Sequence, residues 1–164
     1  MADLETSHAT IDHTGLTGVG GSADLAGEEL DYVQITSAAS ITGTSEGGAT
    51  TVITGTSIAL DGSTTILVEV DAPYWRPDGT NSGDNISLWL FDGATHLGRL
   101  KFFRQRSTGF FEVPLHAEIR LTPSNASHQY IVKASVNAGT GSIGAGPGGS
   151  GGDDVPAFLR ITRV

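Results

Sequence analysis

Residues 111–121 read FEVPLHAEIRL, and this stretch decides the fold. Apolar and polar side chains alternate along it one by one. Successive side chains of a β-strand point to opposite faces of a sheet, so this period of two predicts a strand with one buried and one wet face. The apolar positions are Phe111, Val113, Leu115, Ala117, Ile119 and Leu121.

Similar short runs fill the chain from Leu30 onward, separated by glycine- and proline-bearing turns about every ten residues. Ile66, Val68 and Val70 form another one-sided run, and no helical period is sustained. The pattern predicts an all-β fold, an antiparallel β-sandwich with a jelly roll as the expected topology. Strands are expected at residues 30–36, 40–44, 50–54, 57–60, 64–71, 85–91, 96–103, 109–121, 129–136 and 157–164.

The composition fits one domain with an appendage. The chain has 164 residues, 23 of them glycine, and no cysteine, so thiolate metal sites and disulfides are excluded. No stretch approaches the roughly 18 apolar residues of a membrane helix, and residues 1–10 lack the pattern of a signal peptide. We expect no membrane partner and no secretion by a signal-peptide route.

Charge is divided unevenly along the chain. Residues 1–63 hold nine of the 18 acids and no Lys or Arg, whereas the remainder holds nine acids and all nine bases, so the first part carries the whole net charge of −9. Such asymmetry indicates an acidic segment that meets a basic surface on a partner or a neighbouring copy. The alternative is that the charge keeps an exposed tail soluble. Nucleic-acid binding through this segment is disfavoured because it would repel phosphate.

Residues 1–28 are expected to form an extended acidic anchoring arm, ahead of a sandwich domain at residues 29–164. Glycine is frequent in this arm, and its apolar residues are too scattered for a helical or strand period. They are expected to act as pegs at an interface, with a disordered tail as the alternative. These candidate interface residues are Leu4, Ile11, Leu16, Val19 and Leu25.

A second glycine-rich segment occupies residues 137–154 and contains eight glycines. It includes a GxGxxG pattern at Gly139, Gly141 and Gly144, but a strand is expected after it where a dinucleotide site needs a helix. The segment is therefore expected to be a long exposed loop at one end of the sandwich.

The sequence offers no catalytic constellation. Cysteine and the GxSxG motif are absent, and no pair of carboxylates stands out. His8 and His13 lack further ligands, so they would bind a metal only where a symmetry axis brought several copies together. We expect a non-enzymatic protein without a cofactor, a catalytic residue or a metal site.

Residues 96–106 read HLGRLKFFRQR and form the densest basic region of the chain. Bases interleaved with aromatics can bind single-stranded nucleic acid, but the alternation favours a half-buried strand. With regular alternation, Arg99, Lys101 and Phe103 share one face. We interpret Arg99 and Lys101 as candidate interface residues that receive the acidic arm of a neighbouring subunit.

Tyr74, Trp75 and Trp89 are the conspicuous large aromatics. They are interpreted as core or interface anchors, and a carbohydrate-binding platform remains the alternative.

Taken together, these segments resemble a group of tailed-bacteriophage virion proteins. The resemblance lies in DHTGLTGVGG at residues 12–21, LDYVQIT at 30–36, LDGST at 60–64, the glycine-rich run, and PAFLRITRV at 156–164. It implies a jelly-roll domain that forms homotrimers and an arm that anchors the module to the virion. Its partners would be further copies and the major capsid protein or other virion proteins. A capsid decoration protein is the expected role, with a tail or fibre component that binds a receptor or a carbohydrate as the alternative.

Overall fold

The computed structural model describes residues 26–150 and 153–164, and this part of the chain is all β, as the alternating pattern predicts. Residues 1–25 of the expected arm, with its pegs Leu4, Ile11, Leu16, Val19 and Leu25, lie outside the described residues, as do His8 and His13. The strands are β1 (Glu29–Ile35), β2 (Ala39–Ile41), β3 (Thr50–Asp61), β4 (Ile66–Arg76), β5 (Asn85–Asp92), β6 (Thr95–Arg104), β7 (Val113–Leu121), β8 (Asn125–Val136), β9 (Gly141–Ile143) and β10 (Ala157–Arg163).

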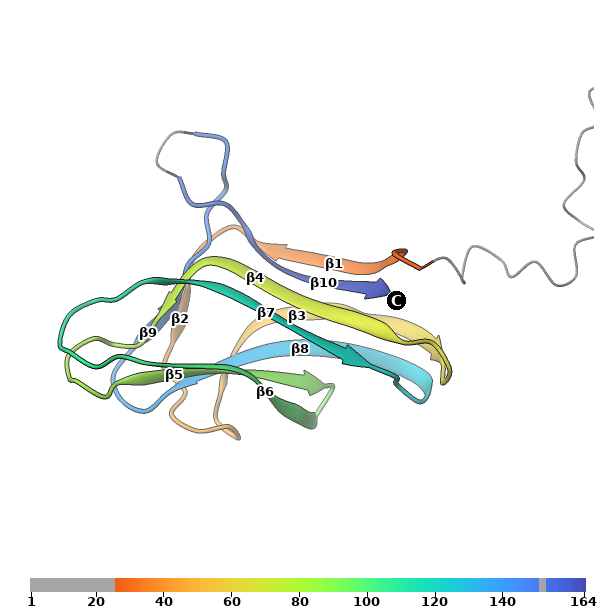
Figure 1. The fold of residues 1–164 in the computed structure, drawn as a ribbon, viewed down its shortest axis with the longest axis horizontal. Coiled ribbons are helices and arrows are strands. Elements are labelled where there is room, and N and C mark those ends of the chain that lie inside the picture. Colours follow the sequence, from red (N-terminus) through yellow and green to blue (C-terminus); the bar gives the residue numbers. More distant parts are fainter. Residues whose placement is uncertain (1–25, 151–152) are drawn as a thin grey trace, which may run out of the picture.

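The strands form two antiparallel sheets, seen one above the other in Figure 1. One sheet runs β1-β10-β4-β7, and the other runs β3-β8-β5-β6. Among these eight long strands the first pairs with the last, the second with the seventh, the third with the sixth and the fourth with the fifth. This nested pairing is the jelly-roll topology, so the expected fold is confirmed.

Strand β4 lies at the centre of the first sheet, with β10 on one side and β7 on the other. Its inward side chains Ile66, Val68 and Val70 are buried, as are Leu115 and Ala117 of β7. The alternation in both strands thus marks the core face correctly. The inward faces of the two sheets enclose a continuous apolar core.

Several strand boundaries differ from the predicted ones. β4 continues past the expected loop start at Pro73 to Arg76, and its pairing with β7 is irregular between Ala72 and Trp75, where the proline lies. The two runs expected at 50–54 and 57–60 form the single strand β3, which bends at two register shifts. β7 begins at Val113 rather than at residue 109.

The prediction that residues 137–154 form one long exposed loop is wrong over part of that range. Residues 141–146 include strand β9, which pairs with the end of β4 beyond the end of β10, and Ile143 is buried. Gly144 donates its N–H to Tyr74 O at 2.8 Å, and a side chain at this position would clash with the Tyr74 ring. Only after Gly146 does the connection leave the sheets (Figure 1).

Asp31 joins the two sheets at the edge where β1 meets β3. It is 7% exposed, its Oδ2 accepts the Thr56 N–H at 2.8 Å, and its Oδ1 accepts the Thr56 hydroxyl at 2.8 Å. These bonds satisfy the backbone at the second register shift of β3, beside Gly55, where a side chain would meet the carboxylate. The carboxylate therefore fixes the bend of β3.

We expect Asp31→Ala to lower the free energy of unfolding by about 2 kcal/mol, because it removes the charged acceptor of both the part-buried Thr56 N–H and the Thr56 hydroxyl. Urea unfolding followed by tryptophan fluorescence measures the change. Glu29→Ala, an exposed position on the same strand, is the control and should change stability by less than about 0.5 kcal/mol. Equal effects of the two substitutions would contradict this role of Asp31.

Candidate functional site

The basic region forms β6, which among the described strands pairs only with β5 and so lies at the edge of its sheet. Trp89 lies opposite Arg99 and Leu88 lies opposite Lys101, so one extra residue, Leu100, is inserted between the two cations. Leu88 is fully buried, which places Lys101 on the inward side while Arg99 lies on the outer face with Trp89. The expectation that Arg99 and Lys101 share a face is wrong, because this bulge reverses the alternation.

Both expected interface cations have partners within the subunit. The Arg99 guanidinium lies over the rings of Trp89 and Phe102, 5.6 and 5.0 Å from their centroids. The Lys101 ammonium donates to His116 O at 2.5 Å, which ties β6 to β7 across the open edge of the sandwich. The Lys101 ammonium is therefore engaged in the link between β6 and β7.

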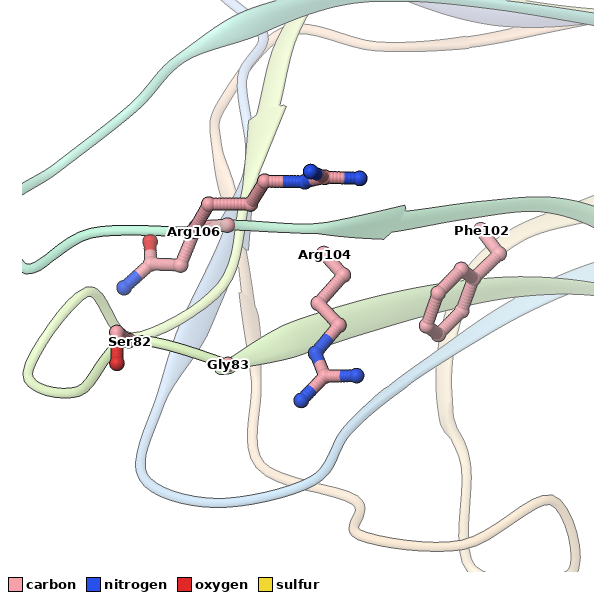
Figure 2. A pocket seen from close by; sticks show the side chains of 6 residues that line it. Ser82, Gly83, Phe102, Arg104 and Arg106 are labelled. Atoms are coloured by element: carbon pink, nitrogen blue, oxygen red, sulfur yellow. The ribbon is translucent and has the colours of Figure 1, made fainter.

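The free cations of β6 lie at its end, around an open hollow of about 530 Å³ that we call the β6-end hollow (Figure 2). Arg104 and Arg106 are exposed, and neither forms an ion pair with another described residue. Figure 2 shows Phe102 and Arg104 projecting to the same side of β6. The hollow is lined by Ser82, Gly83, Phe102, Arg104, Gln105 and Arg106.

A clamp centred on Gln105 holds the hollow in shape. Gly83 donates its N–H to Gln105 O, and Gln105 donates its own to Asp84 O, both at 3.0 Å. The Gln105 side-chain amide is 2% exposed and donates from Nε2 to Asn81 O at 2.7 Å. Its Oε1 is buried and has no hydrogen-bond partner among the described residues.

Gly83 is required where it stands. Its φ of +101° lies in the region that favours glycine, and a Cβ there would lie 3.1 Å from Arg104 Nη2. The guanidinium thus rests directly on the backbone of the loop. A side chain at this position would strain the backbone and shift the Arg104 guanidinium by a few tenths of an ångström.

Exposed aromatic rings surround the same end of the sandwich. Phe110 is 70% exposed, Phe111 is 44% exposed and Phe102 is 46% exposed. A second hollow of about 370 Å³ lies beside the first, and Arg104, Gln105 and Arg106 line both. Aromatic rings together with guanidinium groups are the composition enriched at the centres of protein interfaces.

These phenylalanines are not the aromatics that the sequence nominated. Trp75 is buried and packs on Phe103 with centroids 6.3 Å apart, and Tyr74 packs against Gly144. Trp89 is half-buried beneath Arg99 and donates to Ser135 Oγ at 2.9 Å, so none of the three forms an open platform. Phe111 was expected to face inward, but it precedes β7, and the glycine at 109 beside two adjacent phenylalanines was the available signal of a turn.

His128 forms the most enclosed polar pair. Its Nδ1 lies 2.6 Å from Asp92 Oδ2 and its Nε2 lies 3.0 Å from Ser124 O. Both neighbours are acceptors, so the arrangement favours the protonated imidazole, in which both ring nitrogens donate. Chiefly the bond to Asp92, and then the bond to Ser124 O, raise the pKa of His128 above its usual value. An imidazolium held in this way has no free lone pair to take a proton from a hydroxyl.

Two absences concern only residues 26–150 and 153–164. Within these ranges no group of three or more His, Cys, Asp or Glu side chains is arranged to hold a metal ion. In the same ranges there is no helix with the length and hydrophobicity needed to cross a bilayer.

Comparison with known proteins finds no matching family model and no matching curated protein. Among solved structures, a carbohydrate-binding module of Cellvibrio mixtus lichenase 5A in complex with cellotriose is 17% identical, with 87% of this chain and 94% of that one covered at a TM-score of 0.30. The TNF protein Eiger from S. frugiperda is 11% identical, with 85% and 88% covered at a TM-score of 0.36. At these scores neither likeness bears on function, and the fold assignment rests on the strand order.

Because the pKa of His128 is raised in the folded state, the free energy of unfolding should fall as the pH rises. The imidazolium contributes stability that is fully present below pH 6.5, the usual histidine value, and is lost as the pH rises through the higher pKa of the folded state. We expect His128→Gln to remove this fall, as measured by urea unfolding between pH 5.5 and 9. Asn125→Ala, an exposed position of β8, should leave the profile as in the parent protein. Parallel profiles for His128→Gln and the parent would contradict the assignment.

Proposed function

We propose that this protein is a non-enzymatic structural component of a tailed-bacteriophage virion, which adds to the capsid surface as a homotrimer and stabilises the shell. The observation that carries the proposal is the exposure of three phenylalanine rings. Phe102 and Phe111 lie in the hollows beside the unpaired guanidinium groups of Arg104 and Arg106, and Phe110, next to Phe111 in the chain, lies under the Arg76 guanidinium. A small sandwich that buries its core elsewhere has no folding reason to expose these rings together. Their composition is suited to a protein partner.

The distribution of charge supports assembly. The first part of the chain is acidic, whereas the end of β6 carries two cations. Because the two charges are opposite, copies can attract one another, and each can also attract a charged region of a shell. The resemblance of residues 12–21, 30–36, 60–64 and 156–164 to virion proteins supplies the type of particle. The major capsid protein is the expected partner besides further copies.

The shape of the hollows favours a macromolecular partner over a small molecule. Both hollows at the end of β6 are open to solvent and lie side by side. Small-molecule sites usually enclose most of their ligand's surface, whereas protein partners cover shallow surfaces that hold a few aromatic anchors.

A second candidate is a tail or fibre component that binds a carbohydrate. It is favoured by Phe102, whose exposed ring lies beside the Arg104 donors in the manner of a sugar-stacking site. The site would then be the β6-end hollow rather than Tyr74, Trp75 or Trp89.

Addition of the full chain to shells assembled without it tests the proposal. We expect the parent protein to bind at saturating stoichiometry and to raise the temperature at which the shells release DNA. Phe110→Ser with Phe111→Ser should raise the dissociation constant about 30-fold, because it removes two exposed anchors without touching the core. Tyr32→Ser, a ring on β1 about as exposed as Phe111, is the control and is compared with Phe111→Ser alone.

Binding would be measured by co-sedimentation, and thermal unfolding would verify that each variant folds. Failure of the parent chain to bind shells at micromolar concentration would overturn the capsid assignment. If the chain instead localised to tails and bound glycans with loss on Phe102→Ala, the second candidate would replace it.

A further inference from the structure

Arg104 and Arg106 lie together and form no ion pair with a described residue. Arg120 of β7 also forms none, but it lies opposite Leu67, near the start of β4 and away from them. Arg76, Arg160 and Arg163 lie 2.9 to 3.4 Å from carboxylates of Glu112, Glu69 and Glu28. Arg99 and Lys101 are engaged by aromatic rings and by His116 O. The two arginines at the β6-end hollow therefore remain available for an anion from outside the described residues.

Their placement suits an elongated ligand. In the view of Figure 2, Arg104 extends to one side of β6 and Arg106 to the other. Both residues also line the second hollow, so a segment crossing the end of β6 meets a guanidinium on either side. Arginine binds carboxylates with two parallel hydrogen bonds, which favours carboxylates as the anionic groups.

Gln105 adds an independent requirement. The Gln105 Nε2 donates to Asn81 O, so the atom without a partner is the acceptor Oε1. Flipping the amide would place Oε1 against Asn81 O, and two acceptor oxygens cannot hydrogen-bond to each other. Buried acceptors without partners are uncommon in native proteins, and the residue that carries this one lines both hollows. The oxygen is covered in the free subunit, so a ligand that reaches it displaces part of the clamp and donates an N–H or O–H there, while its carboxylates meet the arginines. A polypeptide rich in Asp and Glu supplies both.

The first 25 residues of this chain have that chemistry. They carry Asp3, Glu5, Asp12 and Asp24 with no Lys or Arg, and isolated apolar side chains that can cover the exposed ring of Phe102. Fully extended, 25 residues span up to about 80 Å, enough to cross from one subunit to the next.

Ala26, the first described residue, lies at the end of the subunit opposite the hollow. A segment of 25 residues can reach the hollow of its own subunit or that of a neighbour, so the choice of a different copy as the donor rests on the proposed homotrimer. Gly27 donates its N–H to Arg163 O, at the end of the sandwich where β4 starts, whereas the loop that carries Gly83 follows the other end of β4. β4 has 11 residues, roughly 35 Å of strand, so the two features lie at opposite ends of the subunit. A contact between them on different copies is head-to-tail, and head-to-tail contacts can close into rings such as a trimer.

We propose that the β6-end hollow binds an acidic stretch of residues 1–25 from a second copy of this chain, through Arg104, Arg106 and Gln105. This inference rests on the proposed function in that it gives the homotrimer its contact. It moves the receiving site from Arg99 and Lys101 to the two arginines at the end of the strand.

Charge reversal in the full chain tests the contact. We expect Arg104→Glu with Arg106→Glu to raise the trimer dissociation constant at least tenfold in sedimentation velocity at low salt. Changing Asp3, Glu5, Asp12 and Asp24 to Lys in the same chain should restore association. Arg120→Glu, an exposed position of β7, is the single-charge control and is compared with Arg104→Glu alone. Equal association of Arg104→Glu and Arg120→Glu would overturn the proposal, even if the parent chain still decorates shells.

A photo-crosslinking amino acid at Ser82 provides a second measurement, both in solution and on the shell. With ¹⁵N-labelled and unlabelled chains mixed, we expect mass spectrometry to find links from position 82 to residues 1–25 of the other isotopic type. Links within one chain only, links to other proteins only, or no links would overturn it.

Discussion

The pairing of β4 on both of its flanks is the constraint on which the rest of the molecule depends. β10 and β7 each bond to it from Ile66 onward, and β9 takes the place of β10 at Trp75. The strand cannot slip by one residue, because a slip would move Ile66, Val68 and Val70 from the core to solvent. Every other strand of this sheet takes its register from β4, directly or through a neighbour.

The features at the end of β6 arise where this regularity stops. β6 lies on the opposite sheet at an open edge, and a bulge there turns Lys101 inward to close the sandwich and leaves Arg99 on aromatic rings. Beyond the bulge, the Gln105 clamp and the bare backbone of Gly83 hold the hollow in which Arg104 lies. The same edge that needs Lys101 for stability thus presents the neighbouring arginines to a partner.

The regular part of the fold was predictable from the sequence, and its irregular part was not. Alternation identified β4 and β7 because each side chain there is sorted by one buried face. Strand β9 was missed because Gly141 and its neighbours have no side-chain period, and its place is set by pairing with Trp75. Arg99 and Lys101 lie on opposite faces of β6 because Leu100 is an extra residue relative to β5. Such a bulge is seen only when β6 is paired with its neighbouring strand. The basic region itself was recognised, but the cations that remain free in it required the three-dimensional contacts.

The most direct measurement of this account is a cryo-electron microscopy map of the full chain in its native particle, at a resolution that traces the main chain. The account predicts that Phe102, Phe110, Phe111 and the two arginines at the end of β6 are covered by protein from a neighbour. Solvent around this end, with contacts made instead through β1 and β10, would contradict it.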